Sequence, residues 1–77
     1  MRIVKAFDNT TLLIIEDEDI NLPLETILSY ARSQGAVSCF PERGGDEIFH
    51  VERSGYGDGS IGYSNLTASE LEKYIRR

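Results

Sequence analysis

Four consecutive apolar residues, Leu12-Leu13-Ile14-Ile15, place the strongest constraint on how this chain can fold. A strand with one face in water alternates apolar and polar residues, and this run does not alternate. It therefore predicts a strand that is covered on both faces, by a helix on each face or by a second subunit. A monomer is slightly favoured, because two amphipathic helices are available to cover the sheet.

A β-hairpin is predicted at the start of the chain. Arg2 to Phe7 is rich in Ile, Val and Phe, and Thr11 to Ile15 contains the apolar run. Between them, Asp8-Asn9-Thr10 has the composition of a turn, because Asp and Asn tolerate left-handed backbone. The two segments are therefore expected to pair as neighbouring strands.

The first helix is indicated by both of its ends. Pro23 suits the first helical position, where its missing N–H costs nothing. Gly35 stands where a helix commonly ends with left-handed backbone. Between them, four apolar residues repeat with helical spacing and predict one buried stripe: Leu24, Ile27, Leu28 and Ala31.

The second helix begins with a capping box. Thr67 is the expected N-cap, and Glu70 stands three residues later, from where its side chain can reach back. Leu66 and Leu71 flank this start with the spacing of a hydrophobic staple.

The middle of the chain predicts three further strands. Ala36 to Pro41 and Glu47 to Arg53 are expected to join through a two-residue Gly44-Gly45 loop, and Ser60 to Tyr63 forms a short fifth strand. Such a loop would pair Phe40 with Phe49 and Cys39 with His50. The expected fold is one α+β domain over residues 1–77, with a small antiparallel sheet and two helices in the order ββαβββα.

Length and composition limit the possible environments. The chain has 77 residues, one cysteine and a net charge of −5. It has no apolar run of the ~20 residues that cross a membrane, and no segment resembling a signal peptide. We therefore expect a cytoplasmic protein without an internal disulfide. The negative charge argues against direct binding to nucleic acid or to an anionic membrane.

Enzymatic chemistry is not expected from this sequence. The segment Gly57 to Gly62 matches the dinucleotide-binding pattern G-x-G-x-x-G, but no helix begins at it. Cys39 and His50 could form a nucleophile–base pair, but no orienting group is evident beside them. The sequence thus predicts no catalytic residues and no cofactor.

A metal site is not expected either. Asp17, Asp19 and Asn21 imitate the first ligands of an EF-hand loop. However, Leu22 stands where that loop requires glycine, and Leu28 where it requires glutamate.

The distribution of charge points to a protein partner. Residues 8–58 carry a net charge of −8, and Glu16-Asp17-Glu18-Asp19 forms an acidic tract. Alternate carboxylates on a strand lie roughly 6.6 Å apart, about twice the ~3.4 Å between backbone charges along a nucleic-acid strand. An acidic edge can therefore imitate a row of phosphates. The predicted partner-binding residues are Glu16, Asp17, Glu18, Asp19, Asp46, Glu47, Glu52, Tyr56 and Asp58.

In its length, its acidic tract and its −8 segment, the chain resembles the small phage-encoded anti-CRISPR proteins. The resemblance implies an inhibitor in the bacterial host cytoplasm that binds a basic CRISPR effector or nuclease. Two alternatives remain open at this point. One is an antitoxin or immunity protein that neutralises a basic nuclease, and the other is a homodimeric interaction module.

Overall fold

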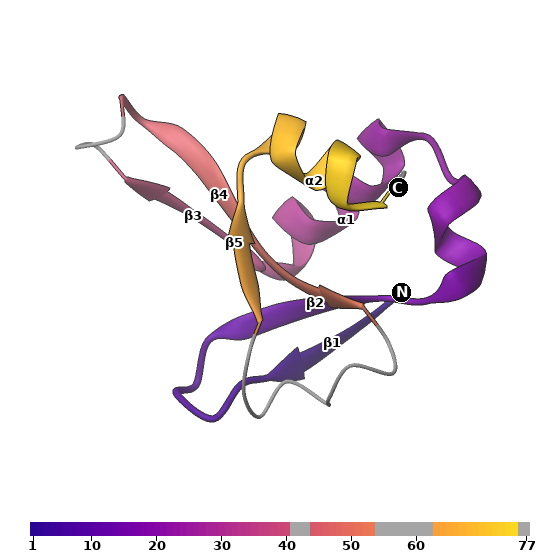
Figure 1. The fold of residues 1–77 in the computed structure, drawn as a ribbon. Helices are drawn as coiled ribbons and strands as arrows, with labels where there is room; N and C mark the ends of the chain where they lie inside the picture. Colours follow the sequence, from indigo (N-terminus) through magenta and orange to yellow (C-terminus); the bar gives the residue numbers. More distant parts are fainter. Residues whose placement is uncertain (41–43, 54–62, 76–77) are drawn as a thin grey trace.

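The computed structural model describes residues 1–40, 44–53 and 63–75 (Figure 1). Its fold is α+β, and its elements follow the predicted order ββαβββα with one added 3-10 helix, η1. The strands and helices are β1 (Arg2–Lys5), β2 (Thr11–Ile15), η1 (Asp17–Asn21), α1 (Leu24–Gln34), β3 (Val37–Phe40), β4 (Asp46–Arg53), β5 (Ser64–Leu66) and α2 (Ala68–Ile75).

The sheet is mixed rather than wholly antiparallel. β1 pairs antiparallel with β2, and β4 pairs antiparallel with both β3 and β5. The pair of β2 and β4 is parallel, with Leu13 opposite Val51. A parallel pair needs a long crossover between its strands, and η1, α1 and β3 supply it here.

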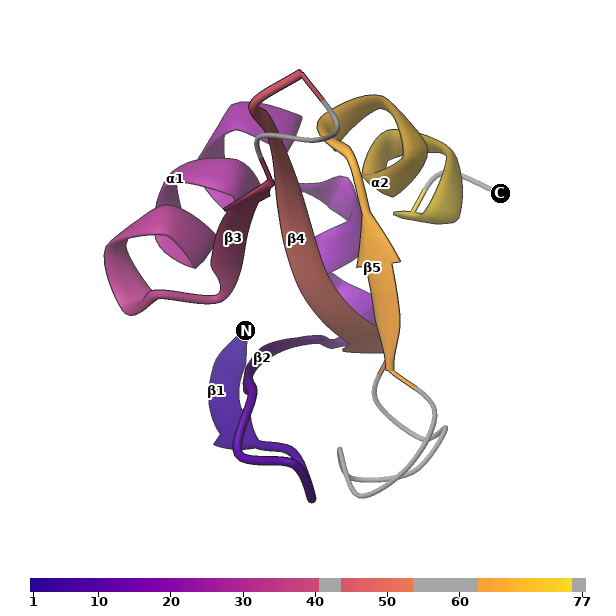
Figure 2. The same ribbon diagram turned by 90° about the vertical axis from the view of Figure 1, so that its left-hand side faces the viewer.

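The strand β4 changes its neighbour along one edge. Residues 46–49 pair with β3, whereas residues 51–53 pair with β2. Figure 2 shows β3 and β2 on one side of β4, with β5 on the other side. Between the two pairings lies His50, whose backbone N–H donates to the carbonyl oxygen of Ala36 at 3.0 Å. This junction places a polar side chain where two strands of the sheet separate.

Both helices cover the same face of the sheet. Side chains from α1, α2 and the strands form one buried cluster: Leu13, Ile15, Ile27, Leu28, Ala31, Ala36, Phe49, Val51, Leu71 and Ile75. The expectation of a helix on each face is therefore wrong. Leu12 and Ile14 face away from this cluster because side chains alternate along a strand. They are nevertheless only 0 and 1% exposed within the single chain.

The register of the β3–β4 hairpin differs from the prediction. Val37 lies opposite Phe49, and Phe40 lies opposite Asp46, so residues 41–45 separate the strands instead of two glycines. Cys39 consequently pairs with Glu47 rather than with His50. In this register Phe49 and Ala36 both belong to the core cluster.

The helix ends agree closely with the sequence signals. α1 starts one residue later than predicted, with Pro23 as its N-cap, and ends at Gly35, whose φ of 80° is left-handed. At α2 the backbone N–H of Thr67 donates to Glu70 Oε1 at 2.9 Å, and that of Glu70 donates to Thr67 Oγ1 at 3.3 Å. The predicted capping box is thereby confirmed. The fifth strand begins at Ser64; of its predicted span, residues 60–62 lie outside the described residues.

Within the described ranges, none of the helices has the length and apolar character needed to cross a membrane.

Candidate functional site

Three carboxylates of the acidic tract form ion pairs or hydrogen bonds with other groups of the same chain. Asp19 is 6% exposed and lies 2.8 Å from the α-amino group of Met1. Glu16 Oε1 accepts a hydrogen bond from Arg2 Nε at 3.3 Å, and Asp17 Oδ1 accepts one from Arg53 at 3.0 Å. The tract is therefore not a free row of carboxylates, and the expectation that Asp19 is at the surface is wrong.

The environment of Asp19 explains its burial. Burial by itself raises the pKa of this carboxyl, but the hydrogen bond and charge of the α-amino group act in the opposite direction. The backbone N–H of Glu16 adds a hydrogen bond of 2.9 Å to Asp19 Oδ2. Together these partners hold the pKa of Asp19 below its usual value of 3.8.

The other predicted partner-binding residues are scattered. Glu52 is 2% exposed, which contradicts its placement on a binding surface. Glu47 accepts two hydrogen bonds from Arg32 Nε, at 3.2 and 3.0 Å, and Arg32 Nη2 lies 2.9 Å away. Asp46 is exposed, as is Glu18, whereas Tyr56 and Asp58 lie outside the described residues.

The fold also keeps the two predicted acidic groups apart. The acidic tract leads into η1, while Asp46 and Glu47 begin β4. Figure 1 shows η1 and the start of β4 at opposite ends of the molecule. One continuous acidic face made from both groups is therefore not formed.

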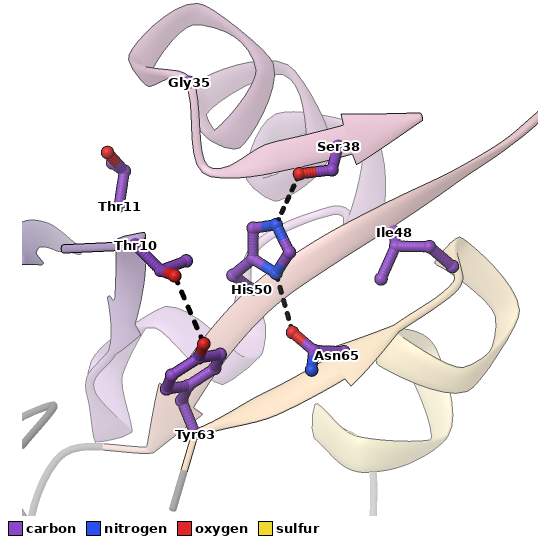
Figure 3. A pocket seen from close by; sticks show the side chains of 8 residues that line it. All are labelled: Thr10, Thr11, Gly35, Ser38, Ile48, His50, Tyr63 and Asn65. Atoms are coloured by element: carbon purple, nitrogen blue, oxygen red, sulfur yellow. Dashed lines mark hydrogen bonds between the residues drawn. The ribbon is translucent and has the colours of Figure 1, made fainter. Parts of the chain in front are cut away.

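A pocket lies beside His50, at the point where β4 stops pairing with β3 and starts pairing with β2. Its volume is about 560 Å³, and it opens beside the β1–β2 turn (Figure 3). We call it the β4 pocket; its described lining residues are Thr10, Thr11, Gly35, Ser38, Ile48, His50, Tyr63 and Asn65. Divergence of β2 and β3 leaves this space beside His50, so the sheet topology itself creates the pocket.

His50 is held at both ring nitrogens. Its Nε2 lies 2.8 Å from Ser38 Oγ, and its Nδ1 lies 2.7 Å from Asn65 Oδ1 (Figure 3). These three side chains come from β3, β4 and β5, and the sheet register brings them to one face. Asn65 lies directly opposite His50. Ser38 lies opposite Ile48, which is two residues before His50 and therefore on the same face of β4.

Tyr63 joins the pocket to the first hairpin. Its hydroxyl group donates to Asp8 Oδ2 at 2.6 Å and lies 3.2 Å from Thr10 Oγ1. The hydrogen bond from Tyr63, followed by those from the side chain and the backbone N–H of Thr10, lowers the pKa of the Asp8 carboxyl. The Tyr63 ring stands edge-on to His50, with 6.3 Å between the ring centroids.

Sequence reasoning singled out His50 but gave it the wrong neighbour. It paired His50 with Cys39, whose Sγ instead donates to the carbonyl oxygen of Gly45 at 2.9 Å. The argument against catalysis rested partly on the lack of an orienting group beside His50, and Asn65 Oδ1 lies 2.7 Å from His50 Nδ1. Ser38 and Asn65 were missed because only the correct strand register identifies them. The observed pairing of β3 with β4 is shifted by three residues from the predicted one, and this shift brings Ser38 to the face of the sheet that carries His50.

The described residues contain no group of three or more His, Cys, Asp or Glu side chains arranged to hold a metal ion.

Comparisons with known proteins give limited information on this chain. No family model matches it, and no solved structure matches it. It is 40% identical over 63 residues to a human protein named beta-1,3-glucosyltransferase. The aligned segment covers 82% of this chain but only 11% of the human protein, so the chain is similar to a small part of it.

Proposed function

We propose that this chain is a binding domain for an uncharged ligand rich in hydroxyl groups, such as a sugar, and that the β4 pocket holds it. The observation that carries the proposal is the lining of the pocket. Hydroxyl, amide and imidazole groups line it beside a tyrosine ring, and its described lining contains no Asp, Glu, Lys or Arg. Small-molecule sites are concave and use placed polar groups to fix the orientation of the ligand.

The hydrogen-bonding groups of the pocket suit a hydroxyl ligand. Asn65 Oδ1 can only accept, so His50 Nδ1 carries the ring proton and Ser38 Oγ donates to Nε2 of the neutral ring. The lone pairs of Ser38 Oγ then remain as acceptors. Thr11 Oγ1 accepts from Lys5 Nζ at 2.8 Å, which leaves the Thr11 hydroxyl proton as a donor. The amide of Asn65 adds two N–H donors. A sugar hydroxyl both donates and accepts, and therefore matches this mixed surface.

The human protein similar to this chain bears a name that refers to glucosyl transfer. Because the chain covers only 11% of that protein, the name does not by itself give this chain the same activity. The name supports the choice of glucose and of a β-1,3-linked glucose disaccharide as the first probes.

Titration of these two probes into isotopically labelled protein, followed by NMR, tests the proposal. We expect chemical-shift changes in the amides of Thr11, Ser38 and Asn65. Replacing Thr11→Val removes a donor, and we expect about tenfold weaker binding. Thr26→Val is the matched control, because Thr26 is exposed on α1 and does not line the pocket. The absence of shifts at the pocket with both sugars would end the proposal.

A second candidate is the protein-binding inhibitor resembling anti-CRISPR proteins, with a basic nuclease as its partner. The net charge of −5 and the exposed carboxylates of η1 favour it, since the Asp17 side chain is 87% exposed and Glu18 is also exposed. Asp19 is excluded from the contact by its burial. In this form the interface lies at the η1 end of the molecule alone.

Inhibition of DNA cleavage by a purified CRISPR nuclease, or by a toxin nuclease, tests this candidate. The variant Asp17→Lys/Glu18→Lys should abolish inhibition, and wild-type inhibition should weaken as salt increases. Asp46→Lys/Glu72→Lys is the control, because it makes the same change of charge away from η1. Equal inhibition by both variants would remove η1 from the interface.

A further inference from the structure

Ser38, His50 and Asn65 form a continuous chain of hydrogen bonds in the β4 pocket. The two distances, 2.8 and 2.7 Å, are typical of well-formed hydrogen bonds. His50 is only 8% exposed, and the contacts at both of its nitrogens fix the plane of the ring. Figure 3 shows the three side chains extending from neighbouring strands toward one another.

The direction of each hydrogen bond follows from Asn65. Its Oδ1 carries only lone pairs, so the facing Nδ1 of His50 carries the ring proton. Nε2 of the neutral ring is then an acceptor. Ser38 Oγ must consequently donate its proton to Nε2.

This arrangement contains the parts that activate a serine. A serine hydroxyl is a weak nucleophile by itself and becomes effective when an oriented base accepts its proton. His50 occupies the position of the base, and Asn65 occupies the position of the orienting group. Ser38 is only half-buried and lines the pocket, so a small molecule can reach its oxygen.

We propose that Ser38 is a nucleophilic residue that takes up the acyl group of an uncharged activated ester, with His50 as general base and Asn65 as a positioning residue. A bond forms between Ser38 Oγ and the ester carbonyl carbon, and the bond from that carbon to the leaving oxygen breaks. The Ser38 proton passes to His50 Nε2 and then to the leaving alcohol or phenol. This activity goes beyond ligand binding and does not depend on the ligand being a sugar.

Acetylation by p-nitrophenyl acetate tests this proposal. The experiment uses a Cys39→Ala background, because the exposed thiol of Cys39 would also react with the ester. Peptide mapping by mass spectrometry should place the acetyl group on Ser38. The rate at Ser38 should exceed that at Ser33 by about 100-fold, which is the lower end of the usual contribution of a general base.

Ser33 is a matched internal control. It is an exposed serine whose Oγ donates to the backbone carbonyl oxygen of Tyr30 at 2.8 Å, so it has a hydrogen bond but no base. Comparison of the two serines needs no variant of the pocket and remains informative even if such a variant fails to fold. Equal acetylation of Ser33 and Ser38 would overturn the proposal.

Variants of Asn65 separate positioning from a merely structural role. Asn65→Asp keeps an oxygen acceptor opposite Nδ1, and we expect it to retain acetylation of Ser38. Asn65→Leu removes that acceptor and should slow acetylation at least tenfold. Thermal unfolding of both variants is measured alongside. Equal rates in both variants, with Ser38 still modified, would contradict the role given to Asn65.

The sugar titration has an independent outcome. The titration measures ligand binding and the acetylation measures attack by Ser38 Oγ, so the two experiments can fail separately. Failure of sugar binding with selective Ser38 acetylation would therefore refute only the proposed ligand. Sugar binding without selective acetylation would refute only the nucleophilic role of Ser38.

Discussion

Two regions of the molecule each bury a carboxyl group, but within the described ranges only one of them provides it with partners. One region is the junction of the N-terminus with η1, and the other is the central strand β4. Asp19 meets the α-amino group of Met1 at 2.8 Å and the backbone N–H of Glu16 at 2.9 Å. Glu52 is more deeply buried, and neither of its carboxylate oxygens has a hydrogen-bond partner among the described residues. The same functional group thus has stabilising partners in one region and, within the described part of the chain, none in the other.

The difference shows that burial alone does not indicate what an acidic residue contributes. A buried polar group costs free energy unless hydrogen bonds or an opposite charge compensate it. Asp19 has that compensation and should stabilise the fold where η1 meets β1. Glu52 has no such compensation from the residues that the structure describes, and it should therefore reduce the free energy of unfolding.

Asp19→Asn should produce the largest effect. The substitution removes the charged partner at 2.8 Å from the α-amino group of Met1 and leaves it only the longer contact with Glu16 Oε2 at 3.9 Å. We expect a loss of about 3 kcal/mol in the free energy of unfolding. Urea denaturation measures this loss. Asp17→Asn is the matched control, because its exposed pair with Arg53 should contribute at most about 0.5 kcal/mol. Similar losses in both variants would show that the buried pair of Asp19 stabilises the fold no more than the exposed pair of Asp17.

The same ion pair predicts how stability depends on pH. Because the pKa of Asp19 is lower in the folded chain than in the unfolded chain, its contribution is complete above the usual value of 3.8. The contribution is lost as pH falls through the lowered pKa. Urea denaturation from neutral pH to about pH 3 should show a smaller acid-induced loss in Asp19→Asn than in wild type. Parallel pH curves for the two proteins would contradict this assignment.

Glu52→Met should act in the opposite direction. Methionine has a similar length and removes the unpartnered carboxyl group, so we expect the free energy of unfolding to rise by about 1–2 kcal/mol. Urea denaturation at neutral pH gives the measurement. A loss of stability would show that Glu52 has a stabilising contact, and the contrast with Asp19 would disappear.

Glu47→Gln should have the smallest effect. Its hydrogen bonds with Arg32 lower the pKa of Glu47, but both side chains are exposed and solvent weakens the pair. The expected loss is smaller than the change caused by Glu52→Met and should vanish at high salt. Thermal unfolding at low and high salt distinguishes this result from a salt-independent loss, which would indicate lost packing instead.

Local signals predicted the elements of this fold well. The strand Thr11–Ile15 was predicted with its observed bounds, and the Thr67 capping box and the left-handed Gly35 were both found. These features depend on residues within a few positions of one another. Their physical causes, side-chain periodicity and helix capping, are therefore visible in the sequence.

The candidate site was far less predictable. The Ser38–His50 contact requires the register of a hairpin whose connection is longer than its two glycines suggested. The contact with Asn65 requires β5 to pair with β4 at one particular position. The burial of Asp19 depends on the α-amino group, which has no side-chain signature. All three features arise from pairings between distant segments, which periodicity does not encode.

The exchange of partners along β4 has a consequence for how the chain folds. The β1–β2 and β3–β4 hairpins join segments that are close in sequence, so each closes a short loop. The parallel pair of β2 and β4 closes a loop that contains η1, α1 and β3, at a larger cost in chain entropy. We expect the two hairpins to form early and their docking through Leu13 and Val51 to limit the folding rate. The space between β2 and β3, and with it the β4 pocket, would then be completed only in that late step.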